Sequence, residues 1–519
     1  MLSKTFSASP LGIQACLVEV EVELAQGLPQ VILVGLPDTA LRESRDRILT
    51  AIRQSRFPYE PRKLIINLAP ADLRKEGSLF DLSIAVGILA AQGIVSQEAV
   101  QQYVMIGELA LDGAIRPVRG VLPIALSMVK HGKNKLLLPV SNVREASIVS
   151  GIECYPVQSL AETVSFLNGE TPISAFQFLQ DLPSEEIETY HASFDFADVQ
   201  GQFQAKRALE IAAAGQHNVL LIGPPGSGKT MLAQRLPTIL PPMSRGESLE
   251  TSALYSIVGQ LNRERPLLTH RPFRTPHHSA SAVALCGGGT HPRPGEISLA
   301  NHGILFLDEF PEFDRSTLES LRQPMEEGEI TIARVQQSLR FPARFLLVAA
   351  MNPCPCGFLG DPRNECSCSS REVWRYRHKI SGPLLDRIDI QVEVPPLRFH
   401  ELNSSQKQES SGEIYVRVAS AREKQLKRFN GLNIEWNGQM FHRLIKKFCT
   451  LGDVESNLLR QAMETFGLSA RAHDKILKVA RTIADLAGSE HIKVEHLAEA
   501  IQYRNLDKAI GNRACILQN

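Results

Sequence analysis

The sequence predicts an α/β protein of two or three domains, with a parallel sheet in its central part and an all-helical C-terminal part. Three observations lead to this prediction. The chain has 519 residues, which is too many for one hydrophobic core. Short apolar strands alternate with helical patterns up to residue 396, and only helical periodicity follows. The composition, with 43% hydrophobic and 22% charged residues, is typical of a globular protein rather than a disordered one.

Neither the net charge nor the hydropathy of the chain indicates a partner. Lys and Arg total 56, as do Asp and Glu, so any surface for nucleic acid must be local. No apolar run reaches the roughly 20 residues that span a bilayer, and the N-terminus lacks a charged segment leading into a sustained apolar one. We therefore expect a cytoplasmic protein without a membrane partner.

Residues 1–168 predict an α/β domain, because their apolar runs alternate with helical periodicity and turn residues separate them. The expected strands are Ala15–Val22, Gln30–Val34, Lys63–Leu68 and Lys135–Pro139, and the expected helices include Phe80–Gln92 and Leu122–His131. Residues 169–193 are acidic and irregular and contain two prolines, which is typical of a linker.

A second domain is expected over residues 194–396, and its clearest feature is a phosphate loop. Asn218–Ile222 predicts a strand and Met231–Leu236 a helix. Between them stand Gly223, Pro224, Pro225, Gly226, Ser227, Gly228, Lys229 and Thr230. Glycines in such a loop let backbone N–H groups surround phosphates at a helix N-terminus. Lys229 is then expected to reach the β- and γ-phosphates of ATP, and Thr230 to hold Mg²⁺.

Two later strands complete the predicted ATP site. Gly303–Glu309 is typical of a buried parallel strand that ends in two carboxylates, where Asp308 binds Mg²⁺ through water and Glu309 polarises the attacking water. The strand Arg344–Ala350 leads to Asn352, whose amide would lie beside the γ-phosphate if the strands are parallel. This order of elements argues against a chance match in a glycine-rich turn.

Residues 397–519 predict an all-helical lid domain. A polar stretch over 403–412 precedes segments with clear helical periodicity. The expected helices are Ile414–Phe429, Gly438–Cys449, Val454–Phe466, Ala470–Ala487 and Val494–Ile501.

Four of the nine cysteines crowd one short segment behind Asn352. Cys354, Cys356, Cys366 and Cys368 form two Cys-x-Cys pairs that nine residues separate. Four thiolates on two tight turns can close a tetrahedral structural Zn²⁺ site, and free or redox-active thiols are the alternative. The basic residues that follow, within 371–379, indicate either a surface coupled to the γ-phosphate sensor or a solvated helix.

With these elements in order, the chain resembles the magnesium-chelatase-like branch of the AAA+ family, and within it the ComM/YifB proteins. The most specific stretches are residues 273–313 and 352–362. The resemblance implies a hexameric ring motor: an ATP-dependent branch-migration helicase that promotes homologous recombination and DNA integration in natural transformation. Its implied partners are single-stranded and branched DNA, further copies of the chain, and a recombinase or other recombination proteins. The alternative is a chelatase-type motor that remodels a protein partner.

The resemblance also implies roles for single residues. Asn352 corresponds to the position called sensor 1, and Arg387 lies in a segment similar to those that offer an arginine finger to a neighbouring subunit. Arg471 resembles sensor 2, at the start of a lid helix. A surface salt bridge is the alternative interpretation of each of these two arginines.

The N-terminal domain looks like the Lon protease fold, which would suggest an ATP-dependent peptidase with a Ser-Lys dyad. The residues argue against that activity. Leu79 stands where the nucleophilic serine would be, and Leu122 stands in place of the lysine. Ser78 is one position away and has no base, so it is not an activated nucleophile. A scaffold or DNA-guiding role is the expectation instead.

Two insertions face the central pore in this branch of the AAA+ family. The first corresponds to about residues 270–297 and the second to Glu329–Phe341, which has a strand-turn-strand pattern. Arginines on flexible hairpins suit sequence-independent contact with phosphates. The candidate DNA contacts are Arg274, His277, His278, Arg293, Arg334 and Arg340, and Arg271 lies in the same region. The histidines are alternatively packed structural groups.

Overall fold

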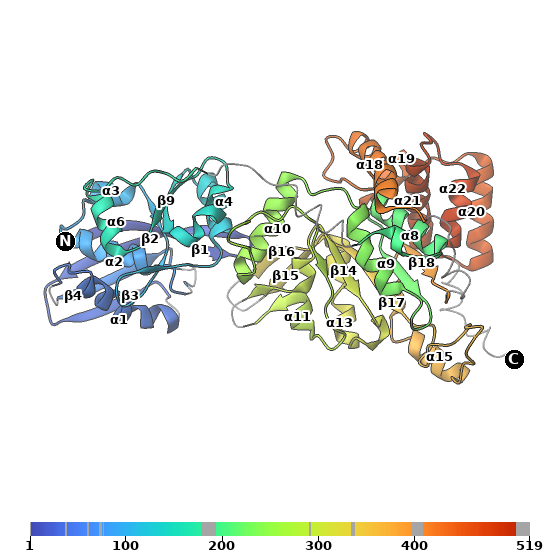
Figure 1. The fold of residues 1–519 in the computed structure, drawn as a ribbon, viewed down its shortest axis with the longest axis horizontal. Coiled ribbons are helices and arrows are strands. Elements are labelled where there is room, and N and C mark those ends of the chain that lie inside the picture. Colours follow the sequence, from blue (N-terminus) through green and yellow to red (C-terminus); the bar gives the residue numbers. More distant parts are fainter. Residues whose placement is uncertain are drawn as a thin grey trace.

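The computed structural model describes residues 2–36, 39–59, 62–71, 75, 77–177, 194–289, 292–333, 338–396 and 408–504. An N-terminal α/β body lies at one end, a body built on a parallel sheet lies in the middle, and a helical C-terminal body lies at the other end (Figure 1). The predicted fold class, with its parallel sheet and helical C-terminal part, is confirmed. In the described part of the chain, no helix has the length and apolar character needed to cross a membrane.

The N-terminal body is a mixed sheet of seven strands in the order β3-β4-β2-β1-β5-β8-β9. The strands are β1 (Leu2–Leu11), β2 (Gln14–Ala25), β3 (Gln30–Val34), β4 (Lys63–Ala69), β5 (Val104–Met105), β8 (Lys135–Pro139) and β9 (Glu153–Val157). A small ribbon joins β6 (Glu108–Leu109) and β7 (Ile115–Arg116). All four strands expected in this region are therefore present. The long strand β1 was not expected, because its apolar residues are interrupted by polar ones.

Six helices accompany this sheet among the described residues. They are α1 (Thr39–Gln54), α2 (Asp81–Ala91), α3 (Gln97–Gln101), α4 (Val121–Lys130), α5 (Val143–Ser147) and α6 (Leu160–Leu167). Helix α2 is buried along its whole length, and it packs on β1 and β2. The two helices expected from periodicity correspond to α2 and α4, so both are confirmed.

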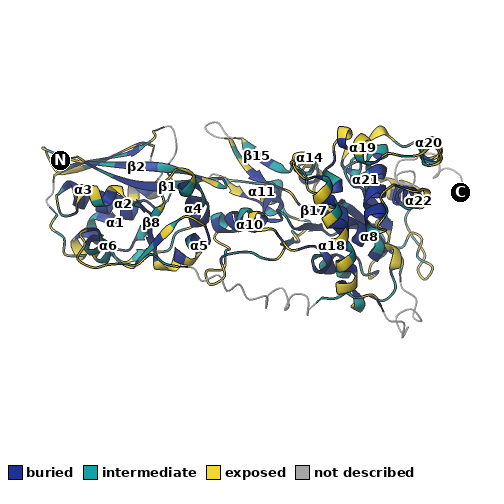
Figure 2. Ribbon diagram, turned by 90° about the horizontal axis from the view of Figure 1, so that it is seen from above, coloured by how far each residue is buried: buried dark blue, intermediate teal, exposed yellow. Residues whose placement is uncertain are grey.

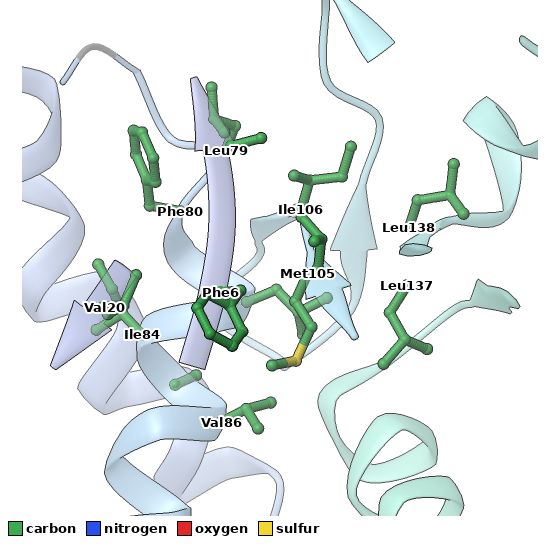
Figure 3. Packing of buried hydrophobic residues seen from close by; sticks show 14 of the residues in the cluster. Phe6, Val20, Leu79, Phe80, Ile84, Val86, Met105, Ile106, Leu137 and Leu138 are labelled. Carbon is green, nitrogen blue, oxygen red and sulfur yellow. The ribbon is translucent and has the colours of Figure 1, made fainter. Parts of the chain in front are cut away.

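The leucines at the two positions that match the protease dyad belong to the hydrophobic core. Leu79 is 8% exposed and Leu122 is fully buried. Figure 3 shows Leu79 and Phe80 with Phe6 of β1 and Met105 of β5 in the cluster of apolar side chains. Burial of apolar area is thus what these leucines contribute here.

The central sheet is entirely parallel, in the order β11-β14-β17-β10-β18. Its strands are β11 (Phe273–Arg274), β14 (Ile304–Leu307), β17 (Leu346–Met351), β10 (Val219–Ile222) and β18 (Ile390–Glu393). The three innermost strands are buried along their whole length, as Figure 2 shows for β17. A sheet covered on both faces explains why these strands appear in the sequence as continuous apolar runs.

Alternate residues of these strands belong to different clusters. Leu221, Phe306 and Val348 pack toward α8 (Phe203–Gly215) and the C-terminal helices. Their neighbours Leu220, Leu305 and Leu347 pack on the opposite face. Because all five strands are parallel, their carboxyl ends lie at the same edge of the sheet, where the chain continues into the loops.

Further elements surround this sheet. Two short hairpins, β12 (Gly287–Gly288) with β13 (Arg293–Pro294) and β15 (Glu329–Ala333) with β16 (Ser338–Pro342), are antiparallel. The helices are α9 (Lys229–Arg235), α10 (Arg245–Val258), α11 (Ala282–Cys286), α12 (Glu296–Leu299), α13 (Arg315–Glu319), α14 (Arg322–Glu327), α15 (Ser370–Arg377) and α16 (Gly382–Leu385). The two strands predicted within residues 329–341 are thus confirmed as β15 and β16, and the turn between them lies outside the described residues.

The C-terminal body is helical throughout its described residues. Its helices are α18 (Ser411–Arg428), α19 (His442–Phe448), α20 (Asp453–Phe466), α21 (Ala470–Leu486) and α22 (Val494–Gln502). All five expected helices are present. Helices α18 and α21 both pack on α8 of the central body, so the two bodies share one hydrophobic cluster.

The N-terminal body contacts the central one through buried polar groups. Ser256 Oγ of α10 donates to Glu145 Oε1 at 2.5 Å, and Gly120 N donates to Ser256 O at 3.2 Å. Glu145 also accepts from the backbone N–H of Leu122 at 2.9 Å. Burial raises the pKa of the Glu145 carboxyl, although these hydrogen bonds oppose the effect.

Candidate active site

The phosphate loop connects the end of β10 to the first turn of α9, as predicted. Gly226 and Gly228 have φ of 74° and 93°, in the left-handed region that favours glycine. A Cβ on Gly223 would lie 2.2 Å from Val394 O, so only glycine fits between the strands there. Gln202, just before α8, stabilises the loop, because its Nε2 donates a hydrogen bond to Ser227 O at 3.1 Å.

The Lys229 side chain lies folded back along the loop. Its Nζ donates to Gly223 O at 2.7 Å and Pro224 O at 2.9 Å, and it lies 3.3 Å from Asn352 Oδ1. Burial lowers the pKa of the Lys229 ammonium, while the Asp308 carboxylate nearby opposes that effect. The lysine and the amide of Asn352 thus meet at the carboxyl edge of the sheet, as the parallel order of β10 and β17 requires.

Thr230 and Asp308 form the second part of this site. Thr230 Oγ1 donates to Asp308 Oδ2 at 2.8 Å, although the two residues are 78 positions apart. Glu309 N donates to Asp308 Oδ1 at 2.9 Å. Glu309 itself has φ of 50°, a conformation that is uncommon outside glycine and is concentrated at functional sites.

These groups fit ATP and Mg²⁺. The Lys229 ammonium is buried against two backbone carbonyls and the Asn352 amide oxygen, so an anion can take their place. A hydroxyl beside a carboxylate supplies the hard oxygen ligands that Mg²⁺ prefers. Mg²⁺, when bound, would neutralise charge on the phosphates.

His278 lies against the candidate catalytic carboxylate. Its Nδ1 is 3.0 Å from Glu309 Oε2, and its ring packs at a tilt of 34° against that of His277 with centroids 4.1 Å apart. His277 in turn contacts Ser279 Oγ at 2.8 Å. Both histidines were predicted as DNA contacts, and that role stays a prediction. The contact with Glu309 was missed, because nothing in the local sequence relates residue 278 to residue 309.

The two candidate arginines line a cavity at the other edge of the sheet. The cavity measures about 980 Å³, and its lining includes Asn218, Phe345 and Asp389, which directly precede β10, β17 and β18. Arg387 and Arg471 line the same cavity. The structure therefore brings these arginines together, but it places them away from the phosphate loop of their own chain.

The guanidinium of Arg387 forms an ion pair and a hydrogen bond within its own chain. Its Nη2 is ion-paired with Glu326 of α14, and its Nη1 donates to Pro383 O at 2.6 Å. The side chain is 11% exposed. Arg471 is exposed at the start of α21. The surface salt bridge considered for Arg387 is thus present in the single chain.

Next to it, a buried ion pair connects the sheet to the helical body. Asp389 Oδ1 accepts from Lys475 Nζ of α21 at 2.7 Å, and Asp389 Oδ2 accepts from Asn218 N at 3.0 Å. Although burial opposes ionisation, the Lys475 ammonium and His217 hold the pKa of Asp389 far below its usual range. This pair was not foreseen from the sequence.

The four clustered cysteines converge on one point. Their sulfur atoms all lie within 4.8 Å of one another. Cys354 Sγ is 3.4 Å from Cys356 Sγ and 3.7 Å from Cys366 Sγ, and Cys356 N donates to Cys368 Sγ at 3.4 Å. Tetrahedral Zn²⁺ with bonds of about 2.3 Å needs sulfurs about 3.8 Å apart, so the group fits Zn²⁺. A hydrogen bond from the backbone of Phe358 contributes most to lowering the pKa of the Cys356 thiol to about 6.

This cysteine cluster packs directly on the phosphate loop. Gly357 has φ of 87°, and a Cβ there would lie 2.7 Å from Pro225 Cδ. The same Cβ would lie 3.8 Å from Asn352 Cγ. The loop that carries the cysteines is therefore in contact with both sides of the predicted γ-phosphate pocket.

We predict about one Zn²⁺ per chain, lost when Cys354 and Cys366 are both replaced by serine. Because a structural site contributes folding energy, the double variant should also unfold at lower temperature. Elemental analysis of freshly purified protein measures the metal. Cys286→Ser is the control, because this cysteine lies outside the cluster and contacts Ser320 instead. Wild-type protein without metal would contradict the prediction.

The predicted DNA contacts have different surroundings. Arg274 is bound by both carboxylate oxygens of Glu296, at 2.6 and 2.7 Å, so its guanidinium is committed to a structural pair. Arg271, in the same region, is buried against Glu247 and His302 O, so its guanidinium is not available to DNA. Arg293 and Arg340 are exposed on the two hairpins.

Arg334 lies outside the described residues, so its place stays a prediction. The two hairpins themselves touch, because a Cβ on Gly287 of β12 would lie 3.2 Å from Ile332 Cδ1 of β15. Their contact was not foreseen from the sequence. It places both predicted insertions on one continuous part of the central body.

Comparison with known proteins gives consistent matches along the chain. Three family models match: magnesium chelatase, subunit ChlI, over residues 195–402; subunit ChlI of Mg-chelatase over 20–142; and magnesium chelatase, subunit ChlI C-terminal, over 408–504. The chain is 45% identical over 507 residues to competence protein ComM of Haemophilus influenzae, and the match covers 97% of each protein.

Two further proteins are similar to this chain at lower identity. The chain is 43% identical to protein YifB of Salmonella typhimurium, with 98% of each protein covered. It is 29% identical over 176 residues to the magnesium-chelatase 38 kDa subunit of Cereibacter sphaeroides, a match that covers 31% of this chain and 53% of that one.

Proposed function

The chain belongs to the ComM/YifB family of magnesium-chelatase-like AAA+ ATPases, and from this premise we propose that it is an ATP-driven ring motor that moves DNA branches. The observation that carries the proposal is the assembled ATP site on a chain that resembles a competence protein over 97% of its length. Branch migration exchanges one base pair for another, so stacking of about 1.4 kcal/mol per step nearly cancels. ATP hydrolysis then needs to supply direction.

Within the ATP site, we propose that Lys229 binds the β- and γ-phosphates and that Thr230 and Asp308 hold Mg²⁺. Glu309 would orient the attacking water, and Asn352 would contact the γ-phosphate. The hydrogen bonds Thr230–Asp308 and Lys229–Asn352 support this assignment, because they connect the segments that follow strands β10, β14 and β17.

A ring is proposed because the two candidate arginines lie away from the phosphate loop of their own chain. Arg387 and Arg471 line the cavity at the amino edge of the sheet, whereas the ATP site lies at the carboxyl edge. In a ring, the amino edge of one subunit can face the ATP site of the next. We propose a hexamer in which both arginines act on the neighbouring nucleotide.

For DNA, the two touching hairpins are the proposed contact surface. Arg293 and Arg340 are exposed there, and the side chain of Arg340 is 72% exposed with a long ion-pair contact to Glu329 of 3.4 Å. Exposed pairs of this kind contribute little, so phosphate can replace the carboxylate. Guanidinium contacts to phosphates are blind to sequence, as a branch-migration motor requires.

The second candidate is a chelatase-type motor that remodels a protein partner without DNA. The family description and the match to the 38 kDa chelatase subunit support it. The ATP site would be the same, so the two candidates differ only in what stimulates hydrolysis.

We predict that single-stranded DNA raises the rate of ATP hydrolysis and that its affinity falls with salt. Each phosphate contact contributes about −0.7 to the slope of log affinity against log salt concentration, so two contacts give about −1.4 or steeper. ATP turnover and DNA affinity are measured at several salt concentrations, with Lys229→Ala as a control for contaminating ATPase.

Replacing Arg293 and Arg340 together by alanine should reduce that slope, whereas Arg322→Ala should not, because Arg322 of α14 is paired with Glu319 of α13. Turnover that DNA leaves unchanged would favour the protein-remodelling candidate.

A further inference from the structure

Helix α15 exposes an aromatic and basic face directly after the cysteine cluster. Val373 and Tyr376 are buried and hold the helix on the central body. Trp374, by contrast, remains 36% exposed, and its ring stacks on His378 with centroids 4.1 Å apart at 24°. Part of the indole ring is therefore accessible at the surface of this polar helix.

Positive charge surrounds this indole. Arg371 and Arg375 are both exposed, one on each side of Trp374 along the helix. Among the described residues neither forms an ion pair, although the charge of Arg375 acts on Glu372. The acidic residue between them, Glu372, is used locally, because it caps the helix by accepting from Ser369 N at 2.8 Å. The face therefore combines a flat ring with two available guanidinium groups.

Helix α15 contacts the segment next to Asn352 of the ATP site. Arg377 Nε donates to Pro353 O at 3.1 Å, next to Asn352. Tyr376 shares a buried cluster with Met351, the last residue of β17. Whatever binds α15 is thus attached to the segment that carries the proposed γ-phosphate contact.

We propose that Trp374, Arg371 and Arg375 form a second contact for single-stranded DNA, separate from the two hairpins. One base stacks on the indole, and the guanidinium groups bind the phosphates on either side. This inference rests on the proposed action on DNA. An aromatic ring between cations suits any base, because every base offers a π-face, and charge complementarity favours nucleic acid over a second copy of this chain.

The chain offers its own probe for this contact. It has two tryptophans, and Trp436 is only 4% exposed and covered by Arg422, whose guanidinium lies 3.5 Å from the ring centroid. An unlabelled oligothymidine should therefore quench the fluorescence of Trp374 selectively. In Trp374→Phe the quenching should disappear while binding persists, because phenylalanine still offers a ring.

Affinity gives the second measurement. Trp374→Ala should weaken oligothymidine binding by about 5- to 150-fold, the range for loss of one stacked base. Arg375→Ala should make the salt slope shallower by about 0.7, the share of one phosphate on a single strand. Arg460→Ala, which removes an exposed charge from α20, is the matched control and should change neither quantity.

The outcomes separate the inference from the proposed function. If the wild-type protein does not bind oligothymidine, the proposed action on DNA fails. If it binds with no tryptophan quenching and with affinity unaffected by Trp374→Ala, the inference fails and the hairpins remain as the contact. If Trp374→Ala instead disrupts assembly in sedimentation without DNA, the face is a subunit interface and the inference is overturned.

Discussion

Replacing Arg387 by alanine is expected to lower the rate of ATP hydrolysis by about 10³- to 10⁵-fold while ATP binding remains. The arginine would stabilise charge on the transferring phosphoryl group of a neighbour's nucleotide, and its absence leaves that charge uncompensated. Its place at the amino edge of the sheet supports action between subunits. On assembly, the guanidinium must leave Glu326. Steady-state turnover and binding of a fluorescent ATP analogue measure the two effects.

A mixing experiment tests whether the arginine acts between subunits. Neither Arg387→Ala nor Glu309→Gln subunits should hydrolyse ATP alone, but together they should recover part of the activity. A working site then forms from the intact Glu309 of one subunit and the intact Arg387 of the next. Recovery should rise with protein concentration. Arg322→Ala is the control, since Arg322 lies on the same helix as Glu326 but is paired with Glu319 of α13. Normal turnover of Arg387→Ala would end both the finger assignment and the argument for a ring.

Replacing Asp389 by alanine is expected to destabilise the central and helical bodies by about 3–5 kcal/mol, the usual cost of removing one partner of a buried ion pair. The change leaves the Lys475 ammonium, whose side chain is 16% exposed, without its carboxylate and Asn218 N without its acceptor. Chemical denaturation can be followed by the fluorescence of the buried Trp436 in a Trp374→Phe background.

Asp474→Ala is the matched control, because it lies beside Lys475 on the same helix but pairs only with two partly exposed histidines. Its effect should stay below about 1 kcal/mol. Since the pKa of Asp389 is depressed in the folded state, its contribution is complete above about pH 4, the pKa of an unfolded aspartate. It is lost as the pH falls further toward the folded-state pKa. Equal denaturation midpoints for wild type and Asp389→Ala would contradict the prediction.

The same ion pair lies beside both candidate arginines in one cavity. Asp389 stands two residues after Arg387, and Lys475 stands one helical turn after Arg471. The Asp389 variant should therefore lose turnover beyond what its stability explains. Turnover measured well below the denaturation midpoint separates the two effects.

The ATP site shows which parts of a site a sequence can reveal. Strand, glycine loop and helix follow one another without interruption, and each step depends only on neighbouring residues, so the loop around Lys229 was predictable. The two carboxylates at the end of β14 were predictable for the same reason. That Thr230 meets Asp308 followed only if the strands were parallel, and the structure has them so.

The exposed arginines show the opposite case. Arg274 and Arg293 look alike in the sequence, yet one is paired with Glu296 and the other is exposed. Whether a guanidinium is available depends on acidic groups far along the chain, and periodicity says nothing about them. Trp374 likewise became informative only when its exposure and its stacking on His378 were known.

The sequence by itself thus determined the fold class, the phosphate loop, the carboxylate pair and the cysteine cluster, because each depends on residues close together in the chain. Only the tertiary structure decided that His278 lies against Glu309, that the cysteine loop packs on Pro225, and that Arg387 shares a cavity with Arg471. These relations depend on strand order and on the packing of loops from distant segments. Side-chain contacts of that kind are set by the whole fold rather than by local pattern.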